Sequence, residues 1–499
     1  MNEQIRNLLT WNVSARDPIV LVALVSMLAF LTFVLVVRPH LYLPLTFATA
    51  PLPKLFTLTQ YESWGNNQTA SGFSVVDLVL AAGISALLFR GWREARSPEA
   101  LAFSRAMFLW SGSVALSVGV GLLLSSDYVF GNSLYALRYI LTLLCYAVGA
   151  RYSLAWRDDR SLGRLLRFLT QTGNVVLLLG VAYYFTFGSS DGGAVGNPML
   201  PGDATVFRSY LFFFDYGIDM GYFAVTVAIL NMLGLSTQTS FASRAAHGIG
   251  LGLTVIAILL LGGRVNLLVL AGAMLYFFLE TSNDSHRSVR VGAVFQLACL
   301  LTLIGVGTIF MLVVGPSQMV GKFENTTRNE YGSDATGVMA EANVPESFAV
   351  FVSTLPIGDN VVRLGLTVAS TWYFFQHPAG VGFWGELPVV GWYAHHEIIK
   401  IAVEQGVPGF VLFWLLMSRL RRLLWNRGDL PGSAGQLGVL LRSMSVGLFL
   451  ALLFNNTVLL DMKFAAVYWT LVGVWSMVPR ARVVQHLPLE LRQREKLHA

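Results

Sequence analysis

The sequence predicts an all-α polytopic membrane protein with about twelve transmembrane helices. Hydrophobic residues make up 55% of the 499 residues and charged residues only 12%, against about 25% charged in a typical soluble domain. The mean hydropathy is +0.61. This number of charged residues is too small to cover the surface of a soluble protein. Most of the surface must therefore face lipid. The composition therefore excludes a soluble enzyme with one anchor, a disordered protein and a nucleic-acid-binding protein.

Twelve apolar runs approach the length of about 20 residues that a helix needs to cross a bilayer. The first run, Ile19 to Val37, is too long for the apolar part of a signal peptide and lacks a small-x-small cleavage site, so it is predicted as a membrane helix. The semi-apolar, Pro-broken stretch 40–60 is a candidate re-entrant piece. The predicted spans are 18–37, 73–90, 105–125, 132–151, 167–187, 211–234, 247–263, 265–280, 291–314, 397–418, 436–454 and 462–479.

The basic residues predict the orientation, because Lys and Arg accumulate in short cytoplasmic loops. With the N-terminus inside, the cytoplasmic segments hold 24 of the 34 Lys and Arg residues. Both termini are therefore predicted to be cytoplasmic. The net charge of +6 lies in these short loops, which favours membrane orientation over nucleic-acid binding as its explanation.

The chain is predicted to form one integral membrane domain, 1–499, with two long outer loops. The loop 188–210 is rich in Gly, Ser and Pro, and the loop 315–396 between spans nine and ten is the largest polar region. Two moderately apolar pieces in the large loop, 346–357 and 361–375, are predicted helices that lie on the membrane surface. Long loops held on a rigid scaffold usually carry function.

Several familiar patterns lack the context that their chemistry needs. Gly380, Gly382 and Gly385 match G-x-G-x-x-G, but no βαβ unit surrounds them, so a dinucleotide site is excluded. His396-Glu397 begins an H-E-x-x-H pattern whose fifth position is Lys400, so a zinc-protease site fails. Cys145 and Cys299 lie inside apolar runs and imply no disulfide framework. We expect no metal site and no cofactor.

The outer face is predicted to collect basic side chains, and charges near the membrane tend to be functional. Arginine suits a diphosphate because its planar fork binds two oxygens at once, and histidine suits general-base catalysis because its pKa lies near ambient pH. A single interfacial arginine is more often a snorkelling anchor. The candidates are Arg208, Arg264, Arg363, His395 and His396, with Lys400 one turn further on.

Aromatic residues in the large loop are candidates for stacking on sugar rings. They are Trp372, Trp384, Trp392 and Tyr393. An aromatic belt at the membrane interface explains the same residues at least as well.

The segment HHEIIKIAVEQGVPG, from His395 to Gly409, resembles the H-N-x-x-L-x-x-x-x-E-x-G-x-x-G signature of the O-antigen ligase and polymerase family. The stretch from Arg363 to FFQHPAGVGFW resembles the family's R-x-x-x-W and P-x-x-G-x-G elements. Gly263-Arg264 resembles its S-R-G motif, and Arg208 with FFFDYGIDMGYFAV resembles its arginine-led segment. The resemblance covers roughly 205–415. Departures include His396 in place of the usual Asn.

The resemblance implies transfer of glycans from an undecaprenyl diphosphate carrier on the periplasmic face of the bacterial inner membrane. The reaction would be inverting and metal-independent. His395 would be the base or the acceptor positioner, Arg208 and Arg264 would clamp the diphosphate, and Arg363 would be a weaker candidate for the diphosphate or the glycan. The implied partners are the lipid-linked glycan donor, a glycan acceptor, membrane lipids and a chain-length regulator.

Three functions remain open from the sequence. A polymerase would join undecaprenyl-diphosphate-linked repeat units, and an O-antigen ligase would differ only in transferring the glycan to lipid A core. A polysaccharide-lipid flippase or transporter would show matched inverted halves, which the sequence lacks, although Asp215 and Asp219 on one helix face keep this alternative open. We favour the polymerase because the chain is long and its outer loop is large.

Overall fold

The computed structural model describes most of the membrane helices and part of the large loop. The described residues are 13–14, 18–51, 54–59, 71–90, 97–124, 130–156, 158–187, 195–196, 205–206, 217–238, 240–260, 264–283, 332–355, 360–383, 396–426, 430, 432–454, 459 and 462–478.

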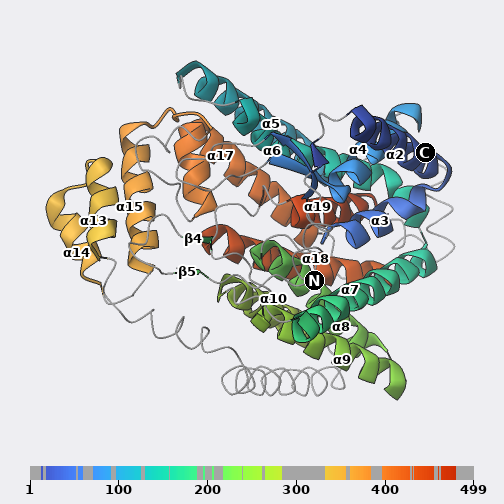
Figure 1. Ribbon diagram of the computed structural model, residues 1–499. Coiled ribbons are helices and arrows are strands. Elements are labelled where there is room, and N and C mark those ends of the chain that lie inside the picture. Colours follow the sequence, from blue (N-terminus) through green and yellow to red (C-terminus); the bar gives the residue numbers. More distant parts are fainter. Residues whose placement is uncertain are drawn as a thin grey trace, which may run out of the picture.

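Helices dominate this part of the chain, and three of them, α13, α14 and α15, lie together at one side of the main bundle (Figure 1). The bundle helices are α2 (Pro18–Val37), α3 (Tyr42–Thr49), α4 (Val75–Arg90), α5 (Pro98–Leu124), α6 (Phe130–Tyr152), α7 (Asp159–Phe187), α8 (Gly217–Thr237), α9 (Phe241–Leu260), α10 (Arg264–Asn283), α17 (Glu397–Trp425), α18 (Gly432–Phe454) and α19 (Met462–Met477). The outer helices are α13 (Gly332–Glu341), α14 (Glu346–Ser353) and α15 (Asn360–Gln376), and two short 3-10 helices are η1 (Pro39–Leu41) and η2 (Ser153–Trp156).

The helices are those of a membrane protein. Among the described residues, α5, α7, α9, α17 and α18 are long and apolar enough to cross a bilayer, and α2 with the bent segment after it makes a sixth if the pair is one span. Shorter apolar helices cover most of α4, α8, α10 and α19. Large apolar side chains such as Phe33, Leu116 and Leu123 are exposed on the bundle surface, as lipid contact requires. Every predicted span coincides with a helix except 291–314, which lies outside the described residues.

Short strands depart from the all-helical prediction. β1 (Val13–Ser14), β2 (Lys54–Thr59) and β3 (Ser71–Ser74) form one sheet in that order, with β1 parallel and β3 antiparallel to β2. β4 (Val195–Gly196) pairs with β5 (Thr205–Val206) inside the predicted loop 188–210. The strands satisfy backbone groups in segments that are too polar or too short to form spanning helices.

The N-terminal sheet sets how α2 and α4 run relative to each other. β1 lies four residues before α2 and β3 leads directly into α4, and both strands belong to one sheet, so the two helices start at the same end of the bundle. The other end of α2 approaches the end of α6, where the Tyr42 and Tyr152 rings are 5.1 Å apart. After α2 the chain bends by 115° into the segment formed by η1 and α3.

Small residues allow close contact between α6 and α19. A Cβ atom at Gly149 would overlap the carbonyl of Thr470, and one at Gly473 would overlap the carbonyl of Tyr146. Close backbone approach at small residues is typical of helix association in membranes. Cys145, on the same helix, is fully buried.

The outer helices α13, α14 and α15 share a separate apolar core. Met339, Val352 and Leu366 are among its buried members. The predicted apolar pieces 346–357 and 361–375 are therefore helical, as α14 and α15. α15 packs beside α17, and the residues after α15 connect this outer unit to the bundle, next to the segment in which charged side chains are buried.

Candidate functional site

The first part of α17 carries three buried charged residues. Glu397, Lys400 and Glu404 are at most 1% exposed, and they follow one another at one-turn spacing. The helix is interrupted at Gly406, whose φ of 67° and ψ of −172° are not helical. Burying a charge in an apolar bundle is costly unless partners satisfy it. These partners define the candidate site.

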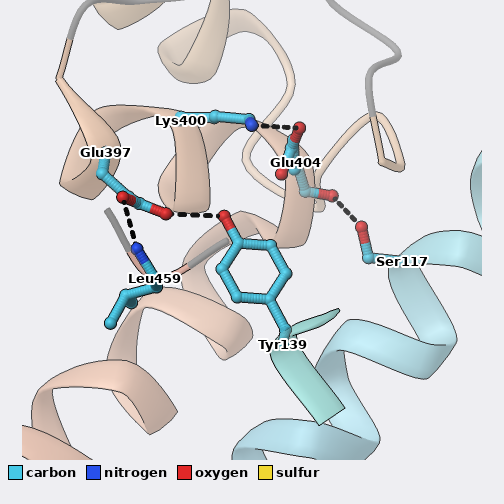
Figure 2. Close-up of polar contacts among 6 residues, drawn as sticks. All are labelled: Ser117, Tyr139, Glu397, Lys400, Glu404 and Leu459. Carbon is cyan, nitrogen blue, oxygen red and sulfur yellow. Dashed lines mark hydrogen bonds and ion pairs between the residues drawn. The ribbon is translucent and has the colours of Figure 1, made fainter. Parts of the chain in front are cut away.

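The Glu397 carboxylate connects three segments that are far apart in the sequence. The Tyr139 hydroxyl of α6 donates to Oε1 at 2.8 Å, and the backbone N–H of Leu459, between α18 and α19, donates to Oε2 at 3.1 Å (Figure 2). Hydrogen bonds to a charged acceptor are the stronger kind. Glu397 therefore fixes the start of α17, and with it the direction from which the preceding residues arrive.

Lys400 and Glu404 form an ion pair one turn deeper. Nζ of Lys400 lies 3.9 Å from Oε1 of Glu404, and both side chains are fully buried (Figure 2). Nζ also lies 5.5 Å from the centre of the Phe383 ring, which adds a cation–π attraction. The ammonium group thus lies between a carboxylate and an aromatic face.

The segment after α15 packs against α17 through its backbone. The N–H of Val381 donates to the carbonyl of Val403 at 3.0 Å, and that of Gly382 donates to the carbonyl of Glu404 at 3.1 Å. The Ser117 hydroxyl of α5 donates to the same Glu404 carbonyl at 3.0 Å (Figure 2). α5, α17 and this segment therefore meet at one point.

Glycine residues allow the backbone of this segment to lie directly against the backbone of α17. Gly380 and Gly382 have φ values of 89° and 85°, which favour glycine. A Cβ atom on Gly380 would lie 2.6 Å from the backbone nitrogen of Gly406. The glycine pattern that superficially matches a dinucleotide motif thus serves tight packing of one backbone on another.

Gly406→Ala is expected to destabilise the protein strongly. Its ψ near 180° at positive φ costs a non-glycine residue about 1–3 kcal/mol, and its Cβ would overlap the backbone of Ala379, which adds a cost of about the same size. Thermal unfolding in detergent measures the change. Gly337→Ala in α13, where a Cβ atom meets open space, is the control, and equal melting temperatures for the two variants would contradict this account.

The structure places only some of the residues predicted for the site. Arg208, His395, Trp384, Trp392 and Tyr393 lie outside the described residues. Arg264 is the first residue of α10, and its side chain also lies outside them. Nothing in the structure therefore brings the predicted arginines together or separates them.

Arg363 and Trp372 both belong to α15 and are both exposed. They are nine residues apart, which is 2.5 helical turns, so they leave the helix on opposite sides. Trp372 is 37% exposed. One bound molecule reaching both side chains would have to wrap around α15.

His396 lies directly before α17 and is half-buried. Its Nδ1 atom is buried and has no hydrogen-bond partner in the described part of the chain. Burial lowers the pKa of its imidazole, so the neutral ring, with one N–H and one free lone pair, predominates at pH 7. A neutral imidazole beside the buried Glu397 is suited to exchange a proton or to hold a hydroxyl group.

Glu397 and Tyr139 are not among the residues predicted for the site, and Lys400 is predicted only as a neighbour of the histidines. The available signal was the charge pattern itself. Three charged residues at one-turn spacing in an otherwise apolar helix predict a buried network. Their partners on α5 and α6 give no such signal, because single Ser and Tyr residues are common in membrane helices.

Within the described ranges, no group of three or more His, Cys, Asp or Glu side chains is placed to hold a metal ion. A scan against models of protein families finds no match for the chain, and a search of curated proteins finds none either. Function is therefore inferred from the residues and their geometry.

Proposed function

We propose that the chain is a glycosyltransferase of the bacterial inner membrane that polymerises undecaprenyl-diphosphate-linked oligosaccharide repeat units on the periplasmic face. In this proposal the chain has about twelve spans, the C-terminal end and the basic loops face the cytoplasm, and 315–396 is periplasmic. The reaction is inverting and needs no metal ion.

The observation that carries the proposal is the meeting of two segments that resemble the same family. Pro378 to Gly382 and Glu404 to Gly406 are separate in the sequence, yet they pack backbone to backbone, and the N–H of Val407 donates to the carbonyl of Pro378 at 2.9 Å. Glu404 to Gly406 lie seven to nine residues after Glu397, the first residue of α17. The helix follows His395 and His396 directly in the sequence. The glycines of the resemblance thus have a shared structural purpose, namely to seat the helix that presents the histidines.

The proposed chemistry is a single displacement at the anomeric carbon of the donor sugar. A hydroxyl group of the acceptor glycan attacks that carbon and forms the new glycosidic bond. The bond from the carbon to the diphosphate oxygen breaks, and the undecaprenyl diphosphate leaves with the electron pair. His395 takes the proton of the attacking hydroxyl, which is a general-base role. His396 is a positioning residue for the acceptor.

Arginine side chains stabilise the departing diphosphate in this proposal. Arg208 and Arg264 are the clamps, because fixed guanidinium groups in a low-dielectric site stabilise charge that develops in the transition state. Arg363, exposed on α15, is the weaker candidate for the diphosphate or the glycan. Trp384 and Tyr393 are the proposed stacking residues for sugar rings.

Reconstitution with a defined substrate tests the proposal. Purified protein in liposomes is expected to convert an undecaprenyl-diphosphate-linked repeat unit into a ladder of lengths on a gel. The activity should survive a metal chelator. A ladder that forms equally in liposomes without the protein, or no product at any length with the protein, would contradict polymerisation.

The runner-up functions give different results in the same liposomes. An O-antigen ligase would give product only after lipid A core is added. A flippase would change the leaflet of the lipid-linked unit without lengthening it, and the fully buried Glu397, Lys400 and Glu404 favour that alternative to the extent that transporters bury ionisable groups in their bundles.

A further inference from the structure

The segment between α15 and Phe383 reaches deep into one end of the bundle. The N–H of Phe383 donates to the carbonyl of Ser117 at 3.0 Å. Ser117 lies seven residues before the end of α5 at Leu124, which is about 10 Å along the helix axis. α5 is one of the helices able to span a bilayer, so this non-helical backbone lies at the depth of its outer turns.

Non-helical backbone at membrane depth must have its polar groups satisfied within the protein. This segment meets that condition at four successive residues. The N–H groups of Gly380, Val381, Gly382 and Phe383 donate to the carbonyls of His377, Val403, Glu404 and Ser117, at 2.9 to 3.1 Å. Gly382 and Phe383 are themselves buried. A loop in water would not need such complete pairing, because water would satisfy it.

An exposed apolar strip runs from α17 onto α15. On α17, Val407, Val411 and Trp414 are 45%, 57% and 39% exposed, at spacings that place them on one face. On α15, Phe375 is 71% exposed and Trp372 is 37% exposed. The two parts approach each other where the N–H of Val407 donates to the carbonyl of Pro378, three residues beyond Phe375, with the exposed Gln376 and His377 between Phe375 and Pro378. α17 is a candidate span, so its part of the strip faces acyl chains.

We propose that the last turns of α15 and the segment 377–383 form a re-entrant element embedded in the lipid leaflet that surrounds the outer end of α5. Trp372 and Phe375 contact lipid at the boundary between head groups and acyl chains, where aromatic side chains are favoured. Arg363, on the other side of the same helix, remains in water. This inference does not depend on the proposed glycan transfer.

Site-directed spin labelling in lipid bilayers tests the element. Labels are placed at Phe375→Cys and at Trp372→Cys, in a chain whose Cys145 and Cys299 are replaced by Ala, with Arg363→Cys as the matched control on the same helix. Collisions with apolar oxygen and with a water-soluble nickel chelate are then compared. We expect the labels at 375 and 372 to be accessible to oxygen and protected from nickel, and the label at 363 to show the reverse.

Two results would overturn the proposal. Equal nickel accessibility at 375 and 363 would place the strip in water. Dipolar broadening between labels at 375 that disappears when labelled protein is diluted with unlabelled protein would show that a second copy, and not lipid, covers it. Thermal unfolding of each labelled variant, compared with that of the cysteine-free parent, shows whether the label leaves the fold intact.

Discussion

Replacing His395 by alanine is expected to lower the rate of glycan transfer by about 10²–10⁴-fold, the usual contribution of a positioned general base. The variant should insert and fold as the parent does, because the start of α17 is held by Glu397 through Tyr139 and Leu459 and not by His395. Single-turnover transfer in liposomes measures the effect, and thermal unfolding supplies the check on folding.

Substitutions of Arg264 test the same reaction at a second residue. Arg264→Ala should abolish transfer, and Arg264→Lys should retain part of it, because lysine keeps the charge but loses the planar fork that binds two oxygens. Near-normal polymer from both His395→Ala and Arg264→Ala would remove these residues from the site. An alanine variant that fails to insert would instead reveal a structural role at the start of α10.

Replacing Lys400 by methionine is expected to destabilise the protein by about 3–5 kcal/mol, which is the usual cost of removing one partner from a buried ion pair. The cause is the Glu404 carboxylate, which stays buried after losing the ammonium group 3.9 Å from Oε1. Methionine matches the length of the lysine stem, so lost packing contributes little. The midpoint of unfolding in a detergent series measures the change.

A second substitution separates the charge from the packing. Lys400→Met combined with Glu404→Gln should recover most of the stability lost in the single variant, because replacing both charges by groups of similar shape is often nearly neutral. The ion pair would be unimportant if Lys400→Met alone stayed close to the parent. An absence of recovery in the double variant would assign the loss to the contact with Phe383 instead.

The helices of this protein could be predicted because lipid imposes one simple requirement on length and polarity. The boundaries were less accurate for a related reason. α5 begins at Pro98 and α7 at Asp159, earlier than the apolar runs at 105 and 167, because both helices extend into flanking segments that contain arginines. Hydropathy reports only the part of a helix that lies in lipid.

The direction of α2 and the buried site could not be predicted from the same information. The direction depends on the turn after Val37 and on a sheet that joins β1 to β3, neither of which a charge count detects. The site depends on pairs such as Glu397 with Tyr139, which are 258 residues apart. The resemblance includes the first part of α17, but it gives no indication that Glu397 and Lys400 within it are buried and paired.

The contacts of Glu397 also constrain how the chain matures during synthesis. Tyr139 is made 258 residues before its acceptor, and the Leu459 donor is made 62 residues after it. At a synthesis rate of about 5–20 residues per second, the Leu459 donor is made roughly 3–12 s after the Glu397 carboxylate. Until the last helical hairpin arrives, the start of α17 is an incompletely satisfied segment at the membrane. A ribosome-stalled chain ending before residue 459 should therefore be far more sensitive to membrane quality-control proteases than the released protein.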